Sequence, residues 1–499
     1  MPDIRVRIAP SPTGPLHIGT ARTALFNYLF ARHTGGTFVL RLEDTDVARS
    51  TVAYEQDILD GLQQLGLTWD EGPDVGADTD RGGYGPYRQM QRLERYGVAA
   101  ADLLARDLAY PCFCTPEELD ADRKAHEAAH EPPRYVGRCA NLTPEERATR
   151  LAAGRPAATR FRVTPGLIRF QDIVRGEVEI DTANLGGDFV IVRGDGTPLY
   201  HFTVVVDDAA MAISHVILGE DHLSNTPKHI LLFQALGYAV PQFAHLPLIL
   251  NPDRTKMSKR KSQTAISDYR AEGFIREALV NYLALLGWST GTEEEILSLE
   301  DLATRFELEH VHKGGAVFDR ERLEWMNGQW IRKLEPEDLI ERLQPFLTAD
   351  LEAGRIDRLP SAEELRPLLA IVQERLPRLG AIGDLVGFLW VDRVEPDPAL
   401  LVPKRWDAAT TREALLAARD TIVAAVGPVT FEADELEPPL RALAETRGWK
   451  AGDLFMAIRV AVTGRTATPP LFDSLVALGR ERVLSRLDSA IGTLGGSSE

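Results

Sequence analysis

Two segments of the sequence carry groups that suit a phosphate. Arg7–Phe30 reads RIAPSPTGPLHIGTARTALFNYLF, and it holds His17 and Gly19 where a strand-like run gives way to a helical pattern. Asn251–Ser262 reads NPDRTKMSKRKS, and three of the chain's nine lysines lie in it. Free N–H groups at a helix start attract anions, and ammonium groups stabilise the charge that develops on a leaving pyrophosphate. The two segments together predict a rigid cradle and a cationic clamp, as an adenylylating site requires.

A phosphate-binding P-loop would end in Gly-Lys-Ser/Thr and a dinucleotide site would read G-x-G-x-x-G, and the first segment has neither pattern. Each of the two segments also has an interpretation in which its role is only structural. His17 could serve only as the cap of the helix that begins near Ile18. The lysines could form a solvated turn. The occurrence of both segments in one chain favours the adenylylating site.

Local patterns predict the elements that position these segments. Residues 4–9 alternate as a strand does, and residues 18–34 carry apolar residues at helical spacing, ended by glycine. The run TFVLRLED predicts a strand buried on both faces, followed by a helix that Ser50 could cap and Gly66 ends. Strand–helix–strand–helix is a parallel α/β unit, and ligands bind beyond the carboxyl ends of its strands.

Changes in composition and residue pattern divide the 499 residues into four expected segments. Residues 1–95 and 201–335 are the two halves of a Rossmann-like α/β catalytic domain with a parallel sheet, and the second half contains the lysine segment. Residues 96–200, with CFC and a charged stretch, are an inserted α/β subdomain. Residues 336–499 are rich in Leu, Ala, Glu and Arg at helical spacing, which predicts an all-helical region.

The composition is that of a globular protein and argues against a membrane-spanning or disulfide-rich one. Hydrophobic residues make up 44% and charged residues 26%, as in an ordinary globular protein. No apolar run is long enough to span a membrane and the N-terminus lacks the layout of a signal peptide, so we expect no membrane partner. Three cysteines are too few for a disulfide framework, which favours a reducing, cytoplasmic location. The net charge of −18 does not exclude a nucleic-acid partner, because binding follows the local field.

The motifs PLHIGT and KMSKR resemble the two signature motifs of class I aminoacyl-tRNA synthetases. Their surroundings resemble bacterial glutamyl-tRNA synthetases, and the likeness continues through RLEDTD and GEDHLSNTPKHILL to GGAVFDRERLEWMNGQWIR, which ends at Arg332. The resemblance implies that glutamate and ATP with Mg²⁺ give glutamyl-adenylate and pyrophosphate, and that glutamate then passes to the 3′-terminal ribose of tRNA-Glu. It also implies a monomer, an inserted subdomain that binds the tRNA acceptor end, a stem-contact region within residues 201–335, and an anticodon-binding helical region.

The same resemblance assigns roles within the predicted site. Arg7 matches the position that binds the side-chain carboxylate of glutamate, and Glu43 matches the one that binds its ammonium group. A turn that caps the next helix is the other interpretation of Glu43. Ser11 and Tyr200 complete the expected glutamate site. The expected catalytic residues are His17, Lys256 and Lys259, and the expected ATP-binding set is Pro10, Gly14, His17, Gly19, Thr20, Glu220, Lys256, Met257, Ser258, Lys259 and Arg260.

Two further assignments follow from the resemblance, and each has an alternative. Some members bind zinc through cysteines and a tyrosine at matching positions, whereas others hold this subdomain without metal. Arg375 matches an arginine that reads an anticodon base in some relatives, and an ordinary surface arginine is the alternative. The candidate zinc ligands are Cys112, Cys114, Tyr135 and Cys139.

Three rival functions fit less well. The paralogue that glutamylates a modified tRNA base ends soon after its lysine loop, whereas this chain continues well beyond its lysine segment. Glutaminyl-tRNA synthetase has a β-barrel C-terminal part, whereas the C-terminal pattern here is helical. A non-catalytic tRNA-binding descendant would have lost His17 or the lysine segment. Leu218, where the family commonly has an arginine that contacts the substrate, is the one feature that favours such a descendant or an altered amino-acid site. The sequence leaves open whether tRNA-Gln is also charged and whether activation requires tRNA.

Overall fold

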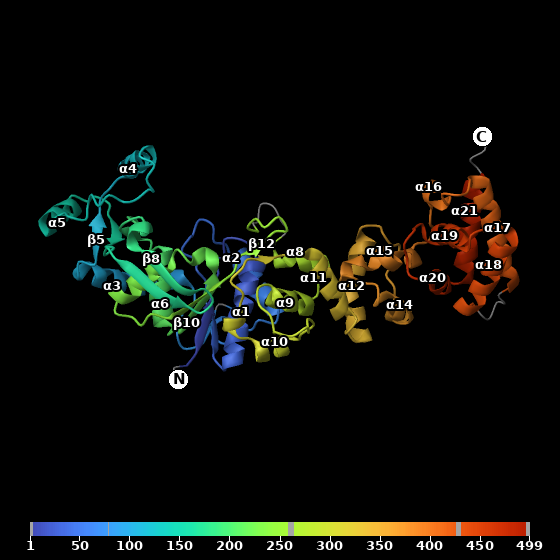
Figure 1. Cartoon of the computed structure of the whole chain (residues 1–499), viewed down its shortest axis with the longest axis horizontal. Coiled ribbons are helices and arrows are strands. Elements are labelled where there is room, and N and C mark those ends of the chain that lie inside the picture. Colours follow the sequence, from blue (N-terminus) through green and yellow to red (C-terminus); the bar gives the residue numbers. More distant parts are fainter. Residues whose placement is uncertain (1–2, 78, 258–263, 426–430, 496–499) are drawn as a thin grey trace. The chain divides into compact units, whose positions relative to one another are not determined.

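A computed structural model describes residues 3–77, 79–257, 264–425 and 431–495 (Figure 1). The chain divides into two compact units, one of Met1–Asp268 with Leu279–Arg320 and one of Tyr269–Ala278 with Glu321–Glu499. In its described residues the first unit combines strands with helices, and the second is helical. This is the fold class predicted from the sequence. The boundaries expected near residues 95, 200 and 335 stay predictions.

Among the described residues, strands occur only in the first unit. They are β1 (Arg5–Ile8), β2 (Thr37–Leu40), β3 (Gly72–Pro73), β4 (Asp80–Arg81), β5 (Ala109–Cys112), β6 (Ala158–Phe161), β7 (Leu167–Asp172), β8 (Gly176–Asp181), β9 (Phe189–Val192), β10 (His215–Gly219), β11 (Gln242–Leu246), β12 (Ile249–Leu250) and β13 (Ala316–Val317). The helices up to the end of the first unit are α1 (Ile18–Thr34), α2 (Val52–Gln64), α3 (Leu93–Ala105), α4 (Pro116–Ala128), α5 (Pro144–Ala152), α6 (Tyr200–Ala210), α7 (Thr226–Ala235), α8 (Ile266–Ala271), α9 (Arg276–Leu285) and α10 (Leu299–Arg305). Those that follow are α11 (Arg320–Ile331), α12 (Pro336–Glu352), α13 (Ala362–Leu365), α14 (Leu369–Val372), α15 (Ile382–Val386), α16 (Pro398–Leu401), α17 (Ala408–Ala425), α18 (Ala433–Arg447), α19 (Ala451–Thr463), α20 (Leu471–Leu478) and α21 (Arg480–Gly495).

The strands that carry the predicted site are parallel. β1 pairs with β2 in a register that runs from Arg5↔Thr37 to Ile8↔Leu40. β1 also lies beside β10, where the Ser214 N–H donates to the Arg5 carbonyl at 3.0 Å, and β10 pairs in parallel with β11. α1 packs against β1, β2 and β10. The carboxyl ends of these strands therefore meet at one edge, as the predicted α/β unit requires.

The first two helices follow local signals in the sequence. α1 has the predicted bounds, and Gly35 follows it with a φ of 66°, a left-handed conformation that glycine adopts at little cost. α2 is capped by Thr51 and not, as expected, by Ser50. The Thr51 side chain accepts the Tyr54 N–H three residues on, and Ser50 lies one residue too early for that contact.

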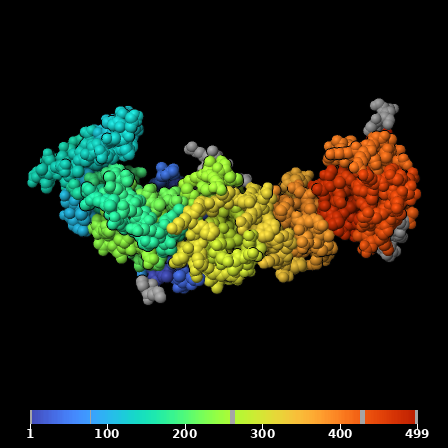
Figure 2. All heavy atoms as spheres, viewed as in Figure 1, coloured from blue at the N-terminus to red at the C-terminus, as the bar shows by residue number. Residues whose placement is uncertain are grey.

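The inserted subdomain contains a small antiparallel sheet and a hairpin. β5, β6 and β9 form a three-stranded antiparallel sheet. β7 and β8 pair antiparallel, and β7 joins the main sheet through β11 at Asp172↔Phe243. α4 and α5 have no buried residue, and Figure 2 shows their segment, in cyan, standing out from the rest of the first unit.

The helices of the second unit share one apolar core. α17, α18, α19 and α21 pack against one another, and their fully buried side chains include Leu415, Leu440, Ile458 and Leu487. Removal of such side chains from water is the main term that stabilises the bundle. Over the ranges that the structure describes, no helix combines the length and the apolar character needed to cross a bilayer.

Candidate active site

A cavity of about 720 Å³ lies at the carboxyl ends of β1 and β10. Its wall includes the turn after β1, the start of α1 and the described part of the lysine segment. Gly14 and Glu220 do not line it, and Ser258, Lys259 and Arg260 lie outside the described residues. The predicted site residues that line the cavity are Arg7, Pro10, Ser11, His17, Gly19, Thr20, Glu43, Tyr200, Lys256 and Met257.

His17 both caps α1 and forms part of the cavity wall. Its Nδ1 accepts the N–H groups of Gly19 at 3.1 Å and Thr20 at 3.3 Å, so we assign the proton of the neutral ring to Nε2. Nε2 lies 3.1 Å from the Thr20 hydroxyl. The Ile18 N–H donates to the Thr264 carbonyl. These N–H groups are therefore occupied, contrary to the free cradle expected from the sequence, and a phosphate here would meet the His17 ring.

The described part of the lysine segment is tied to the residues that follow β10. Lys256 Nζ lies 3.0 Å from Asp221 Oδ2, and both side chains are about half exposed. Asp221 also lines the cavity. Glu220, which was expected at the ATP site, pairs with Arg175 at 2.5 Å, and its place at that site stays a prediction. An incoming triphosphate would compete with Asp221 for Lys256, because both are anionic.

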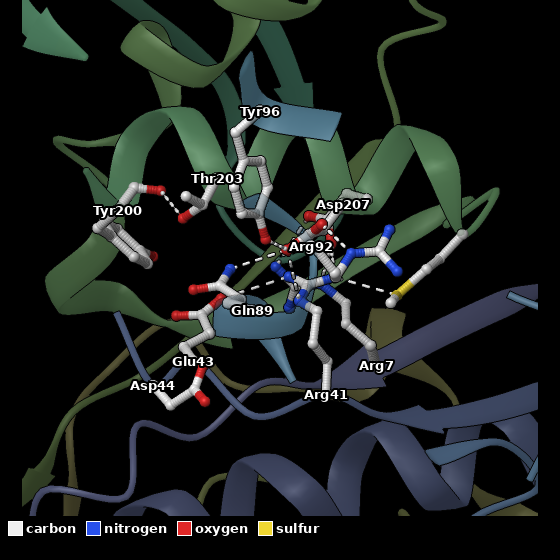
Figure 3. A network of polar contacts seen from close by, with 12 residues as sticks. Arg7, Arg41, Glu43, Asp44, Gln89, Arg92, Tyr96, Tyr200, Thr203 and Asp207 are labelled. Atoms are coloured by element: carbon white, nitrogen blue, oxygen red, sulfur yellow. Dashed lines mark hydrogen bonds and ion pairs between the residues drawn. The ribbon is translucent and has the colours of Figure 1, made fainter. Parts of the chain in front are cut away.

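Arg7 and Glu43 of the cavity wall belong to a buried network of charged side chains (Figure 3). Arg7 donates to both carboxylate oxygens of Asp208 at 3.1 Å. The fully buried Arg41 donates to Asp208 at 2.8 Å and to Glu43 at 3.3 Å. Of these four residues only Arg7 and Glu43 line the cavity. The network thus presents one cation and one anion, which suits a ligand that carries a carboxylate and an ammonium group.

Burial and the neighbouring arginines set the ionisation of this network. Burial raises the pKa of Glu43 to about 7, despite the opposing charges of Arg41 and Arg7. Burial acts in the same direction on Asp208, but Arg7 and Arg41 outweigh it and hold the pKa of Asp208 below its usual value. Asp208 is therefore a carboxylate at neutral pH, whereas Glu43 is balanced between its two forms.

Several polar residues of the cavity wall are absent from the predicted set. They include Asp221, His222 and Asn225, which follow β10 directly. The His222 Nδ1 lies 3.2 Å from the Tyr200 hydroxyl, and burial lowers the pKa of His222, so its neutral ring is a hydrogen-bond partner for Tyr200. The segment GEDHLSNTP could have indicated these residues, since side chains that follow a parallel strand face the ligand edge.

Leu218 lies in the cavity wall with 8% of its surface exposed. The family commonly has an arginine at this position, so the leucine changes the wall of the site itself. Arg22 also lines the cavity, but it is buried and its guanidinium donates to the carbonyls of Leu286 and Pro247. This arginine is already engaged in holding the fold, and the wall at Leu218 is apolar.

The three cysteines of the chain converge in the inserted subdomain. Their Sγ atoms, from Cys112, Cys114 and Cys139, lie within 4.8 Å of one another. The Tyr135 hydroxyl lies 3.5 Å from Cys112 Sγ and 3.6 Å from Cys114 Sγ. Arg160 donates to Cys112 Sγ at 3.2 Å. Three sulfur donors and one oxygen donor at these separations fit the tetrahedral coordination of zinc.

Arg375 lies in the second unit, beside a hollow of about 320 Å³. Trp325 and Arg332 line the same hollow, and the Trp325 side chain is 46% exposed. Exposed aromatic and guanidinium groups suit an unstacked RNA base. The Arg375 side chain is exposed and its Nη1 lies 3.4 Å from the Ile371 carbonyl, as an ordinary surface arginine would be. Both interpretations of Arg375 are compatible with this placement.

The chain is similar to known proteins over almost its whole length. Residues 3–325 match the family model described as tRNA synthetases class I (E and Q), catalytic domain, and residues 338–491 match an anticodon binding domain. A glutamate–tRNA ligase of Symbiobacterium thermophilum is 45% identical over 97% of this chain and 99% of its own, and one of Carboxydothermus hydrogenoformans is 44% identical over 95% and 97%. The crystal structure of a glutamate tRNA ligase from Elizabethkingia meningosepticum, in complex with its amino acid, superposes with a TM-score of 0.84 at 33% identity, covering 99% of this chain and 100% of that one. The chain therefore belongs to the glutamyl and glutaminyl family of class I aminoacyl-tRNA synthetases.

Proposed function

We propose that this chain activates L-glutamate with ATP and transfers it to the 3′-terminal ribose of tRNA-Glu. The observation that carries the proposal is the charge pattern of the cavity. Arg7 and Glu43 offer a cation and an anion, and His17, the cap of α1, and Lys256 also line the cavity. Relatives named glutamate–tRNA ligases, matched along nearly the whole chain, support the same choice of substrate.

The residues act by holding reactants and stabilising charge. Glutamate places its side-chain carboxylate on Arg7 and its ammonium group on ionised Glu43, so that its α-carboxylate is free to attack the α-phosphorus of ATP. The new bond joins a carboxylate oxygen to that phosphorus, and the bond to pyrophosphate breaks. His17 donates to the phosphates, and Lys256 exchanges Asp221 for the leaving pyrophosphate. Mg²⁺ on the triphosphate, when bound, neutralises part of its charge.

The second step needs the tRNA. A hydroxyl of the terminal ribose attacks the carbonyl carbon of the adenylate, and AMP leaves. The helical second unit supplies the contact with the anticodon, with Arg375 as the proposed reader of a base. A monomer in the cytoplasm, as expected from the sequence, belongs to the same proposal.

We also propose a structural zinc ion in the inserted subdomain. Cys112, Cys114 and Cys139 would hold it as thiolates, with Tyr135 as the fourth ligand. Zinc bound in this way ties β5 to the loop that carries Tyr135 and contributes to folding. Measurement of bound zinc by mass spectrometry should give about one ion per chain, and clearly less after Cys139→Ser. A metal-free wild-type protein with an intact fold would refute the zinc site.

The function is tested by charging of purified tRNA-Glu and tRNA-Gln with labelled glutamate and Mg-ATP. We expect charging of tRNA-Glu, and the tRNA-Gln arm decides whether that tRNA is also a substrate. Lys259→Ala is the control, because the resemblance to the family implies that Lys259 binds the leaving pyrophosphate. Failure of the wild-type protein to charge either tRNA, with binding of tRNA retained, would favour a non-catalytic tRNA-binding protein.

A further inference from the structure

Asp208 is the one carboxylate that contacts Arg7 among the described residues. It lies on α6, is 2% exposed and does not line the cavity. Arg7 donates from Nε to Oδ1 and from Nη2 to Oδ2 of Asp208, each at 3.1 Å. Such a two-point contact fixes the plane of the guanidinium as well as its position. Asp208 therefore determines which edge of Arg7 faces the cavity.

The contact leaves part of Arg7 available to a ligand. A guanidinium has five N–H groups, and Asp208 accepts from two of those on Arg7. Both N–H groups of Nη1 and one of Nη2 have no partner among the residues that the structure describes. These groups form the end of the guanidinium, which can bind a second carboxylate through two parallel hydrogen bonds. Since Arg7 lines the cavity, a substrate carboxylate can reach that end.

Asp208 is itself held by Arg41, which stands beside Arg7 in Figure 3. Arg41 donates from Nη1 to Asp208 at 2.8 Å and from Nη2 to Glu43 at 3.3 Å. Its side chain is fully buried, so solvent does not weaken these contacts. One buried guanidinium thus links the residue that holds Arg7 to the anion that faces the cavity.

We propose that Asp208 is a positioning residue for the selection of glutamate. It holds Arg7 so that the free end of the guanidinium receives the side-chain carboxylate at the spacing at which Glu43 receives the ammonium group. The inference rests on the proposed function, because it places glutamate in this cavity. Asp208 itself touches no substrate and acts through Arg7.

The test is Asp208→Asn, with glutamate, ATP and tRNA-Glu titrated separately in the charging assay. Asparagine has nearly the same size, but it replaces one acceptor oxygen by an N–H donor, so one of the two contacts with Arg7 is lost. Because a charged hydrogen bond is worth a factor of about ten or more, the KM for glutamate should rise about tenfold or more. The KM values for ATP and tRNA should change by less than about twofold, because these substrates do not use Arg7.

Two comparisons separate positioning from general damage to the fold. Arg5, on the same strand, makes a matching two-point pair with Glu71 at 2.9 and 3.0 Å but does not line the cavity. Glu71→Gln should therefore leave all three KM values unchanged. The second comparison is an Arg7→Lys background, where lysine cannot make the two-point contact. If Asp208 acts through Arg7, Asp208→Asn should add less than about twofold to the glutamate KM there.

Asp208→Glu provides a second variant if Asp208→Asn does not fold. It keeps the charge that Arg41 requires but moves the carboxylate oxygens, and it should also raise the glutamate KM selectively. The assignment is overturned if the folded variants raise the KM for ATP as much as that for glutamate, or if the full effect persists with Arg7→Lys. A wild-type protein that charges no tRNA would overturn the proposed function and this assignment with it. That result comes from the wild-type protein alone, so it can be told apart from a failure of the assignment, which only the variants reveal.

Discussion

Replacement of Glu43 by glutamine should make the protein more stable at alkaline pH while it impairs the use of glutamate. Burial holds the pKa of Glu43 at about 7, above its usual 4.5. Folding therefore favours the neutral form of Glu43. The free-energy penalty of keeping the ionised carboxylate in the folded protein is absent below about pH 4.5 and complete above about pH 7. At about 1.4 kcal/mol for each tenfold change in ionisation, a pKa that moves from 4.5 to about 7 corresponds to roughly 3 kcal/mol. Glutamine keeps the oxygen that accepts from Arg41 and removes the charge.

The assay is urea unfolding of the wild-type protein and Glu43→Gln at a series of pH values from about 5 to about 8. The difference in the free energy of unfolding should be small at the acid end and should approach roughly 3 kcal/mol in favour of the variant at the alkaline end. Glu71→Gln is the matched control with the opposite sign. Burial acts to raise the pKa of Glu71, but hydrogen bonds from Arg5 and Tyr87 outweigh burial and hold this pKa below its usual value. This variant should be less stable than the wild type at neutral pH, and the difference should shrink towards acid.

Charging assays on the same proteins supply the functional half of the prediction. Ionised Glu43 is the proposed partner of the substrate ammonium group, so Glu43→Gln should raise the glutamate KM by about tenfold or more at about pH 8. For the wild-type protein the glutamate KM should rise as the pH falls below about 7, since the ionised fraction of Glu43 falls. A variant that is less stable than the wild type at alkaline pH, or a stability difference that does not change with pH, would show that burial does not destabilise the ionised form of Glu43.

Three further variants test other parts of the chain. Gly383→Ala should destabilise the second unit by about 2 kcal/mol or more, because a Cβ there would lie 2.0 Å from Oδ2 of the buried Asp350. Gly97→Ala on α3 is its control and should stabilise by about 0.5–1 kcal/mol, since nothing lies within 4 Å of the added carbon; thermal unfolding compares the two, and equal effects would contradict both. Arg375→Ala should raise the KM for tRNA-Glu by about tenfold while the KM for glutamate is unchanged, and an unchanged tRNA KM would favour the ordinary surface arginine.

The fold was predictable to the extent that its signals are local. The bounds of α1 follow from apolar spacing and the glycine that ends it, and the parallel unit follows from the order of strand and helix patterns. The capping residue of α2 was missed by one position, because Ser50 and Thr51 are adjacent and both suit a cap. Local pattern thus gives the elements well and their terminal residues less well.

The candidate site was predictable only for residues that lie in recognisable motifs. Arg7 and Asp208 are 201 positions apart, and no spacing rule relates them. Arg92 and Asp207 are likewise joined at 2.6 Å across 115 positions. Such pairs arise when the fold brings distant strands and helices together, so the sequence indicates Arg7 as a substrate contact but not what holds it. His17 shows the reverse, since its two roles as cap and as cavity wall occur together and did not have to be alternatives.

A crystal structure with a non-hydrolysable analogue of glutamyl-adenylate, in which a sulfamoyl group replaces the phosphoryl group, tests directly whether Arg7 and Glu43 select glutamate. We expect the side-chain carboxylate on the free end of the Arg7 guanidinium, the ammonium group on Glu43 and the sulfamoyl group near His17. The contact between Arg7 and Asp208 should be retained. An analogue bound in the reverse direction, or one that leaves Arg7 and Glu43 untouched, would show that this pair does not select glutamate.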